Sequence, residues 1–206
     1  MTGVFITFEG GDGSGKSTQV ALLADELRSQ GYSVVATREP GGTAIAEKIR
    51  DVLLDPANHE MGDRTEALLF AAGRAEHVHH LIRPAISRGD VVISDRFMDS
   101  SVVYQGMGRG LGAPDVMGLN MWATDNLRPD LTIILDVDAG FGLDRIGDKD
   151  RIEQASPELH NKVRQGFLQL AAADPQRYLV IDASQTVEAI AAEVLERVEE
   201  LLRERA

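Results

Sequence analysis

The residues with the clearest chemistry lie between Gly10 and Ser17, which read Gly-Gly-Asp-Gly-Ser-Gly-Lys-Ser. This segment matches the G-x-x-x-x-G-K-[ST] pattern of a phosphate-binding loop, whose glycines let successive backbone N–H groups point at one phosphate. Lys16 is expected to reach the outer phosphates of a nucleoside triphosphate, and the Ser17 hydroxyl to ligate Mg²⁺. The loop follows an apolar run and opens onto a helical pattern, which favours nucleotide binding over an ordinary glycine-rich turn. The expected nucleotide contacts are Gly10, Gly11, Asp12, Gly13, Ser14, Gly15, Lys16, Ser17 and Thr18.

Two other apolar runs end in residues suited to phosphate chemistry. Arg38 follows residues 33–37 and is placed to clamp an anionic group, although Pro-Gly sequences such as the one after it also occur in simple turns. Asp95 ends residues 91–95, where a carboxylate organises Mg²⁺ in a Walker B element. Arg96 beside it is suited to hold phosphate bidentately. A buried Asp–Arg pair with a structural role alone is the alternative.

Arginines beyond the phosphate loop indicate a second, phosphorylated substrate. The Asn-Lys-x-Asp element by which GTPases read guanine is absent from the sequence. We therefore expect a small phosphotransferase. The alternatives are another nucleoside monophosphate or small-metabolite kinase, and a non-catalytic nucleotide-binding switch.

Short apolar runs alternate with helical patterns along the chain, which predicts a parallel sheet covered on both faces. The expected strands are residues 4–8, 33–37, 91–95, 131–137 and 178–182, and the expected helices are residues 17–29, 43–54, 64–87, 113–126, 157–173 and 186–205. The predicted fold is α/β, with a five-stranded parallel sheet flanked by helices in a single domain of 206 residues. A polar, charged stretch at about residues 145–153 is the candidate lid over the phosphates, with a plain surface loop as the alternative.

Composition limits the functional classes. The formal net charge of −12 argues against broad nucleic-acid binding, which requires a basic surface. The chain has no cysteine, so disulfides and cysteine nucleophiles are excluded. No apolar run reaches the ~18 residues that a membrane span needs, and no secretory signal is recognisable. These features predict a cytoplasmic protein with no membrane partner.

Three ordered motifs point to a family. They are Phe-Glu-Gly-x-Asp-Gly-x-Gly-Lys-Ser-Thr at 8–18, Arg-Glu-Pro-Gly-Gly-Thr at 38–43 and Asp-Arg-Phe-x-Asp-Ser-Ser-x-x-Tyr-Gln-Gly at 95–106. Together with Arg-Pro-Asp-Leu-Thr at 128–132 and Asp-Arg-Ile-Glu-Gln at 150–154, the set resembles the bacterial thymidylate kinases, which have the three-layer P-loop kinase fold. The resemblance runs over nearly the whole chain.

The resemblance implies transfer of the γ-phosphoryl group of ATP to dTMP, giving dTDP on the route to dTTP, with Mg²⁺ as cofactor and a homodimer as the assembly. By the same resemblance Phe70 stacks on thymine and Arg74 binds its carbonyl edge, whereas the residues alone suggest a core phenylalanine and a surface arginine. The implied dTMP site consists of Asp12, Arg38, Glu39, Arg50, Phe70, Arg74, Arg96, Ser101, Tyr104 and Gln105. Within it, Asp12 faces the sugar hydroxyl, and Arg50 supports Glu39. Ser17, Asp95 and Glu39 are the implied Mg²⁺ residues.

The phosphate loop carries Gly13 where some relatives carry an arginine. The missing charge must come from elsewhere, and the lid offers Arg145, Lys149 and Arg151. An arginine matches phosphate geometry better than a lysine. Arg151 is therefore the first candidate for the catalytic lid cation, and Arg145 the second.

Two other groups carry less information. His77, His79 and His80 lack the further ligands that zinc requires, so we expect them on a solvated helix face. Residues 182–184 end the last expected strand, and they are a candidate for adenine contacts through the backbone.

Overall fold

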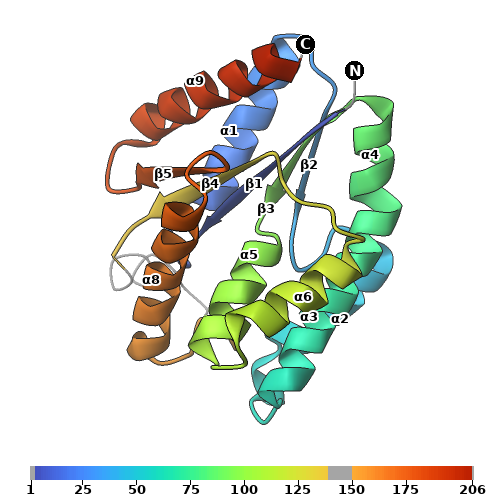
Figure 1. The fold of residues 1–206 in the computed structure, drawn as a ribbon, viewed down its shortest axis with the longest axis vertical. Coiled ribbons are helices and arrows are strands. Elements are labelled where there is room, and N and C mark those ends of the chain that lie inside the picture. Colours follow the sequence, from blue (N-terminus) through green and yellow to red (C-terminus); the bar gives the residue numbers. More distant parts are fainter. Residues whose placement is uncertain (1–2, 139–149, 206) are drawn as a thin grey trace.

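Five parallel strands form the centre of the molecule in the computed structural model, which describes residues 3–138 and 150–205 (Figure 1). The strands are β1 (Val4–Gly10), β2 (Val34–Arg38), β3 (Val91–Asp95), β4 (Leu131–Asp136) and β5 (Tyr178–Asp182). Their order across the sheet is β2-β3-β1-β4-β5, and every neighbouring pair is parallel. The central strand β1 leads directly into the phosphate loop, so the loop emerges in the middle of the sheet's carboxyl edge.

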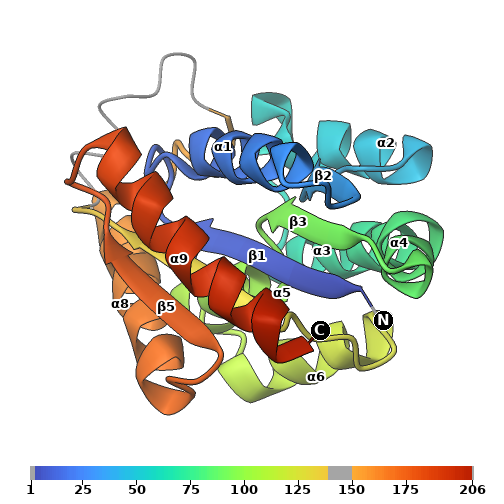
Figure 2. The same ribbon diagram turned by 90° about the horizontal axis from the view of Figure 1, so that it is seen from above.

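Helices cover both faces of the sheet, as Figure 2 shows. The α-helices are α1 (Lys16–Ser29), α2 (Ala44–Leu54), α3 (Asp63–His77), α4 (Arg83–Arg88), α5 (Met98–Ser101), α6 (Ala113–Ala123), α8 (Pro157–Ala173) and α9 (Val187–Arg205). Three shorter segments are the 3₁₀ turn η1 (Pro56–Asn58) and the π-helical segments η2 (Val78–Ile82) and η3 (Val102–Gly108). Helices α1 and α9 pack on one face, whereas η2, α4, α5, η3 and α8 pack on the other.

The alternation of side chains along β1 divides the core into two layers. All seven residues of β1 are buried, and successive side chains of a strand point to opposite faces of its sheet. Ile6 and Phe8 pack in the cluster that contains Leu23 of α1, whereas Phe5 packs edge-to-face on Phe97, with 4.9 Å between the ring centroids. A strand buried on both sides fixes the phosphate loop rigidly at its end.

The predicted α/β architecture and its five parallel strands are confirmed. The expected single helix over residues 64–87 is instead α3, η2 and α4. Pro84 in the first turn of α4 has no N–H to donate, and the N–H of Arg83 bonds to Val78, five residues back. The helical segment over α5 and η3 was not expected from the sequence. Of the expected lid, only residues 150–153 lie within the described part of the chain.

Candidate active site

A cavity of about 260 Å³ opens at the carboxyl edge of the sheet. In open α/β sheets ligands bind at this edge, where the order of the strands reverses. All ten residues expected to bind dTMP line the cavity, together with Lys16, Ser17 and Asp95. The structure thus brings together side chains from the phosphate loop, β2, α2, α3, β3 and η3.

The phosphate loop owes its shape to glycines at backbone angles that other residues rarely adopt. Gly10 has a φ of 135°, and a Cβ atom there would lie 2.4 Å from the carbonyl oxygen of Leu135. Gly15 has a φ of 94° and precedes the first residue of α1. The backbone can therefore turn tightly and present the N-terminus of α1 to an anion.

Lys16 is buried beneath this loop. Its ammonium group donates to the carbonyl oxygen of Gly11 (2.7 Å), and more weakly to Gly10 and Ser14 (both 3.3 Å). Burial and the nearby Arg96 guanidinium lower the pKa of Lys16 to about 8. A bound phosphate would add to the favourable charge of Asp12, Asp95 and Glu9 and offset the burial of this ammonium group and its repulsion by Arg96.

Ser17 and Asp95 meet at the mouth of the loop. The Ser17 hydroxyl donates to Asp95 Oδ2 at 2.6 Å. A hydroxyl and a carboxylate are oxygen donors of the kind that Mg²⁺ prefers, and Mg²⁺ commonly uses one or two protein ligands together with phosphate oxygens and water. The pair therefore fits the expected metal. Among the described residues no cluster of three or more His, Cys, Asp or Glu side chains could hold a metal ion by itself.

Asp12 and Arg96 form a close ion pair within the cavity, and Tyr104 donates its hydroxyl to Asp12 Oδ2 at 2.8 Å. Burial acts to raise the pKa of Asp12, but the Arg96 guanidinium and the Lys16 ammonium outweigh it and hold the pKa below its ordinary value. Arg96 itself has a φ of 69°, a strained backbone position for a residue with a side chain. Such strain persists only where surrounding contacts enforce it.

Glu9 enforces the conformation of this turn. Its carboxylate accepts hydrogen bonds from the backbone N–H groups of Phe97 (2.8 Å) and Ser100 (3.2 Å) and from the Ser100 hydroxyl (2.6 Å). The same Ser100 hydroxyl accepts a bond from Arg96 Nη1 at 3.0 Å. Complete burial and the neighbouring Asp99 raise the pKa of Glu9 to about 7. Glu9 thus connects the central strand to the guanidinium that faces the cavity.

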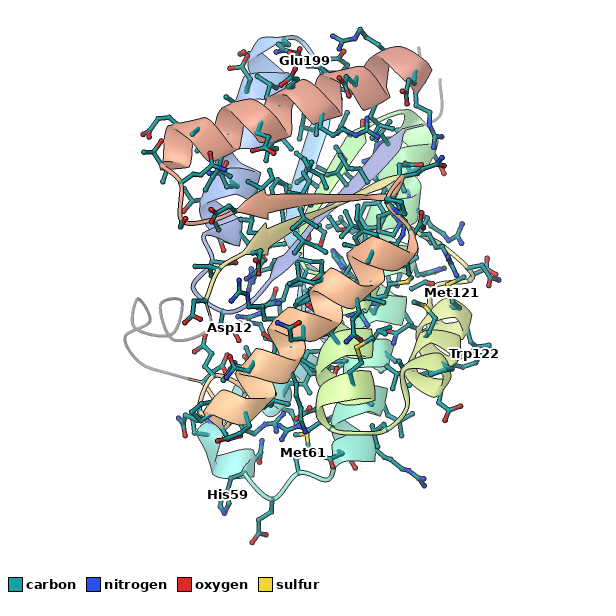
Figure 3. All side chains as sticks on the ribbon, turned by 60° about the vertical axis from the view of Figure 1, so that its left-hand side comes forward. Asp12, His59, Met61, Met121, Trp122 and Glu199 are labelled. Carbon is teal, nitrogen blue, oxygen red and sulfur yellow. The ribbon has the colours of Figure 1, made fainter. Side chains whose placement is uncertain are left out.

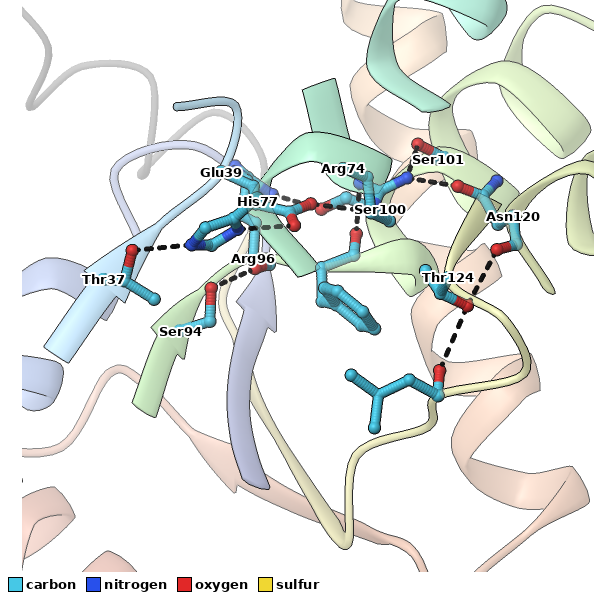
Figure 4. Close-up of polar contacts among 12 residues, drawn as sticks. Thr37, Glu39, Arg74, His77, Ser94, Arg96, Ser100, Ser101, Asn120 and Thr124 are labelled. Carbon is cyan, nitrogen blue, oxygen red and sulfur yellow. Dashed lines mark hydrogen bonds and ion pairs between the residues drawn. The ribbon is translucent and has the colours of Figure 1, made fainter. Parts of the chain in front are cut away.

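A buried ionic network holds the opposite side of the cavity (Figure 4). Glu39 accepts bonds from Arg74 Nε (2.7 Å) and pairs with His77 Nδ1 (2.9 Å), and His77 Nε2 lies 2.8 Å from the Thr37 hydroxyl. His77 is 0% exposed, so its expected place on a solvated helix face is wrong; His79 and His80 are exposed. Arg50, expected to support Glu39, donates instead to the carbonyl of the next residue, Pro40 (2.8 Å), and the described residues show no direct hydrogen bond between Arg50 and the Glu39 side chain.

Arg74 uses most of its donors within the protein. In addition to Glu39, it donates to Ser101 Oγ (2.9 Å), to Asn120 Oδ1 and to the Phe97 carbonyl (3.0 Å). It is 2% exposed and therefore not the surface charge that the residues alone suggested. Phe70, one turn earlier on α3, is half-buried and lines the cavity rather than the core.

Arg38 and Arg50 border the cavity from β2 and α2. Arg38 makes a half-exposed ion pair with Glu47 (2.9 Å). Burial and the like charge of Arg38 lower the pKa of Arg50. Two guanidinium groups of like charge that line one cavity favour an anionic ligand there.

Comparison with known proteins agrees with this geometry. A family model described as thymidylate kinase matches residues 8–194. The chain belongs to the thymidylate kinase family. Thymidylate kinases from Symbiobacterium thermophilum and Clavibacter sepedonicus are 55% and 52% identical to it, over 98% of this chain in both cases and over 95% and 97% of theirs. The crystal structure of thymidylate kinase from Ehrlichia chaffeensis has a TM-score of 0.80 at 37% identity, covering 97% of this chain and 99% of that one.

Of the three expected lid cations, only Arg151 lies within the described residues. Arg145 and Lys149 lie outside the described residues. Arg151 is buried: its Nη1 lies 2.7 Å from Glu66 Oε2, and its Nε donates to the Leu53 carbonyl at 2.7 Å. Its Nη2 is buried without a hydrogen-bond partner among the described residues. The proposed catalytic arginine therefore rests beside the cavity, in an ion pair.

The sequence did not indicate the buried polar residues that form hydrogen bonds to the cavity wall. They are Glu9, Glu66, His77 and Asn120. A signal existed for Glu66, since a charged residue on the apolar side of the Phe70 helix must find partners when buried.

No helix of the described residues is long and apolar enough to cross a membrane.

Proposed function

We propose that this chain transfers the γ-phosphoryl group of ATP to dTMP, giving dTDP. The observation that carries the proposal is the single cavity that joins the phosphate loop to all ten expected dTMP residues. Membership of the thymidylate kinase family supports the same reaction.

The reaction requires no covalent enzyme intermediate and no strong general base, because the attacking oxygen of the dTMP phosphate is already anionic. Catalysis then depends on positioning and on neutralising charge. Lys16 binds the outer phosphates of ATP, while Arg96 and Arg38 hold the phosphate of dTMP. Asp12, fixed by Arg96 and Tyr104, accepts a hydrogen bond from the sugar hydroxyl.

Ser17 and Asp95 hold Mg²⁺ in this proposal, with Glu39 near the metal and the dTMP phosphate. When bound, the ion neutralises charge on the transferring phosphoryl group. Both Glu39 oxygens already face Arg74 and His77, so Glu39 acts mainly by ordering the turn before Pro40.

Phe70 stacks on the thymine ring, and Ser101, Gln105 and Arg74 bind its polar edge. A lid cation, Arg151 or Arg145, completes the charge around the phosphoryl group and closes the site to water. For Arg151 this step requires release from Glu66.

A coupled assay of ATP consumption with a panel of monophosphates tests the reaction. We expect dTMP to be the preferred acceptor, with dTDP identified as product. A preference for UMP or AMP would indicate a different monophosphate kinase, and binding of ATP and dTMP without dTDP formation would indicate a non-catalytic module.

We also propose a cytoplasmic homodimer. Ile45 and Val52 of α2, Leu68 of α3 and Trp122 of α6 are exposed apolar side chains on helices that pack side by side. Figure 3 shows Trp122 projecting from the body of the molecule. Sedimentation velocity checks the stoichiometry, and a monomer at all accessible concentrations would contradict it.

A further inference from the structure

Glu66 is a buried carboxylate that none of the proposed chemical steps uses. It lies on α3 with a side chain that is 1% exposed. Its Oε1 accepts a hydrogen bond from Gln105 Nε2 at 2.9 Å. Its Oε2 faces Arg151 Nη1 at 2.7 Å and Arg109 Nη2 at 3.4 Å, and Arg109 Nε lies 3.4 Å from Oε1. Such a carboxylate is costly to bury, and its three partners offset that cost.

This contact decides which way the Gln105 amide points. A carboxylate only accepts hydrogen bonds, so the amide nitrogen of Gln105 must face Glu66. The carbonyl oxygen Oε1 then lies on the opposite side of the amide, and no described residue donates to it. Because Gln105 lines the cavity, this orientation leaves its carbonyl oxygen available to a ligand as an acceptor.

Arg74 offers the complementary donor. Four of its five N–H directions are used by Glu39, Ser101, Asn120 and Phe97. One N–H of Arg74 Nη2 has no partner among the described residues, and Arg74 lines the same cavity. An acceptor and a donor in the same cavity match a pyrimidine that carries a ring N–H beside a carbonyl group.

Thymine has this pattern at N3–H and O4, whereas cytosine has the reverse, a bare N3 beside an amino group. We propose that Glu66 is a positioning residue that sets base specificity by holding the Gln105 amide with its oxygen toward the base. The inference rests on the proposed function, because it assumes that dTMP occupies this cavity.

Glu66→Gln is the sharpest test. Arg109 and Arg151 both need an acceptor, so the new amide keeps its oxygen toward them and turns its NH₂ group to Gln105. Gln105 must then flip, and it presents a donor where thymine also has a donor. We expect KM for dTMP to rise and the ratio of kcat/KM for dTMP over dCMP to fall by about tenfold or more, the effect of one misdirected base-edge hydrogen bond.

The matched control is Asp63→Asn, the same change on the same helix at a half-exposed carboxylate that lies 3.7 Å from Arg109. It should leave the dTMP-to-dCMP ratio unchanged. Glu66→Asp keeps the negative charge opposite both arginines but shortens the reach to Gln105. It should therefore lower the dTMP-to-dCMP ratio by less than Glu66→Gln does. It provides the test if Glu66→Gln does not fold.

Loss of thermal stability with an unchanged ratio in both Glu66 variants would overturn the inference and leave Glu66 a structural residue. Failure of the proposed function is distinguishable, because the unmodified chain would then form no dTDP.

Discussion

The two ends of the cavity are built by different means. At the phosphate end, Gly10 to Ser17 form one continuous segment, and Asp95 ends the adjacent strand with Arg96 directly after it. At the base end, α3, η3 and α6 each contribute isolated side chains, which buried ion pairs and hydrogen bonds join. The proposed phosphate site therefore depends mainly on backbone geometry, supported by the buried contacts of Glu9 and Arg96, whereas the proposed base site depends on side-chain networks alone.

The two ends should respond differently to substitution. A change at an exposed position of the phosphate loop, such as Ser17, should alter turnover with little effect on folding. A change in the network at the base end should alter stability and base selection. Arg151 is the residue that crosses this division, since it is proposed to act on the phosphoryl group but lies in an ion pair with Glu66.

Arg151→Ala gives the largest expected effect. If Arg151 is the lid cation, kcat should fall by about 10³-fold or more while the affinity for dTMP changes little. Steady-state kinetics with dTMP titration and direct binding separate the two quantities. Equal or higher turnover would contradict the lid assignment, and a rise in KM for dTMP with lost stability would place Arg151 in the base-end network.

Arg74→Met should strongly destabilise the fold, because it leaves Glu39 with one partner in a buried site. The expected loss is about 3–5 kcal/mol in the free energy of unfolding. Urea denaturation measures it. The matched control is Arg38→Met, which breaks a half-exposed ion pair and should cost about 0–1 kcal/mol. Equal losses in the two variants would remove the distinction between the ends.

Glu9 makes stability depend on pH at the phosphate end. Its pKa in the folded protein is about 7, above the ordinary 4.5, so the folded state holds this proton more tightly than the unfolded state. The stabilisation is complete below pH ~4.5 and is lost as pH rises through about 7, by about 3 kcal/mol in total. The difference between the unfolding free energies of the wild type and Glu9→Gln should therefore fall over this range. A constant difference would contradict the assignment.

Lys16 gives the smallest effect. Because its pKa is about 8 in the ligand-free protein, ATP affinity should weaken above pH 8, by up to about tenfold per pH unit. Isothermal titration calorimetry from pH 7 to pH 9.5 measures this loss. Lys16→Met should bind ATP weakly with no such dependence over the same range, and a wild-type affinity that is flat above pH 8 would contradict the shifted pKa.

The same contrast explains what the sequence could predict. The phosphate loop and the ends of β2 and β3 were readable because their spacing along the chain determines their geometry. The five strands were readable because each is short, apolar and bounded by helical patterns. The family resemblance supplied Phe70, Arg74 and Gln105, which the residues alone did not distinguish from core or surface positions.

The supporting network could not be predicted. Glu39 meets Arg74 and His77 across 35 and 38 positions of sequence, and only the packing of α3 on the sheet edge brings them together. The sequence does not distinguish His77 from its neighbours His79 and His80. In the structure His77 lies on the buried face of α3, where its side chain contacts Thr37 of β2. Partner choice among buried polar groups follows from tertiary structure, and no local pattern encodes it.

Trp122 is the only tryptophan of the chain, and its side chain is 83% exposed on α6. Its indole emission therefore reports on one surface and on nothing in the interior. Because that surface carries the proposed contact between subunits, the protein contains its own fluorescent reporter of assembly. Diluting the protein through the concentration range in which the dimer dissociates should shift the emission maximum of Trp122. Binding of ATP at the phosphate loop should leave it unchanged.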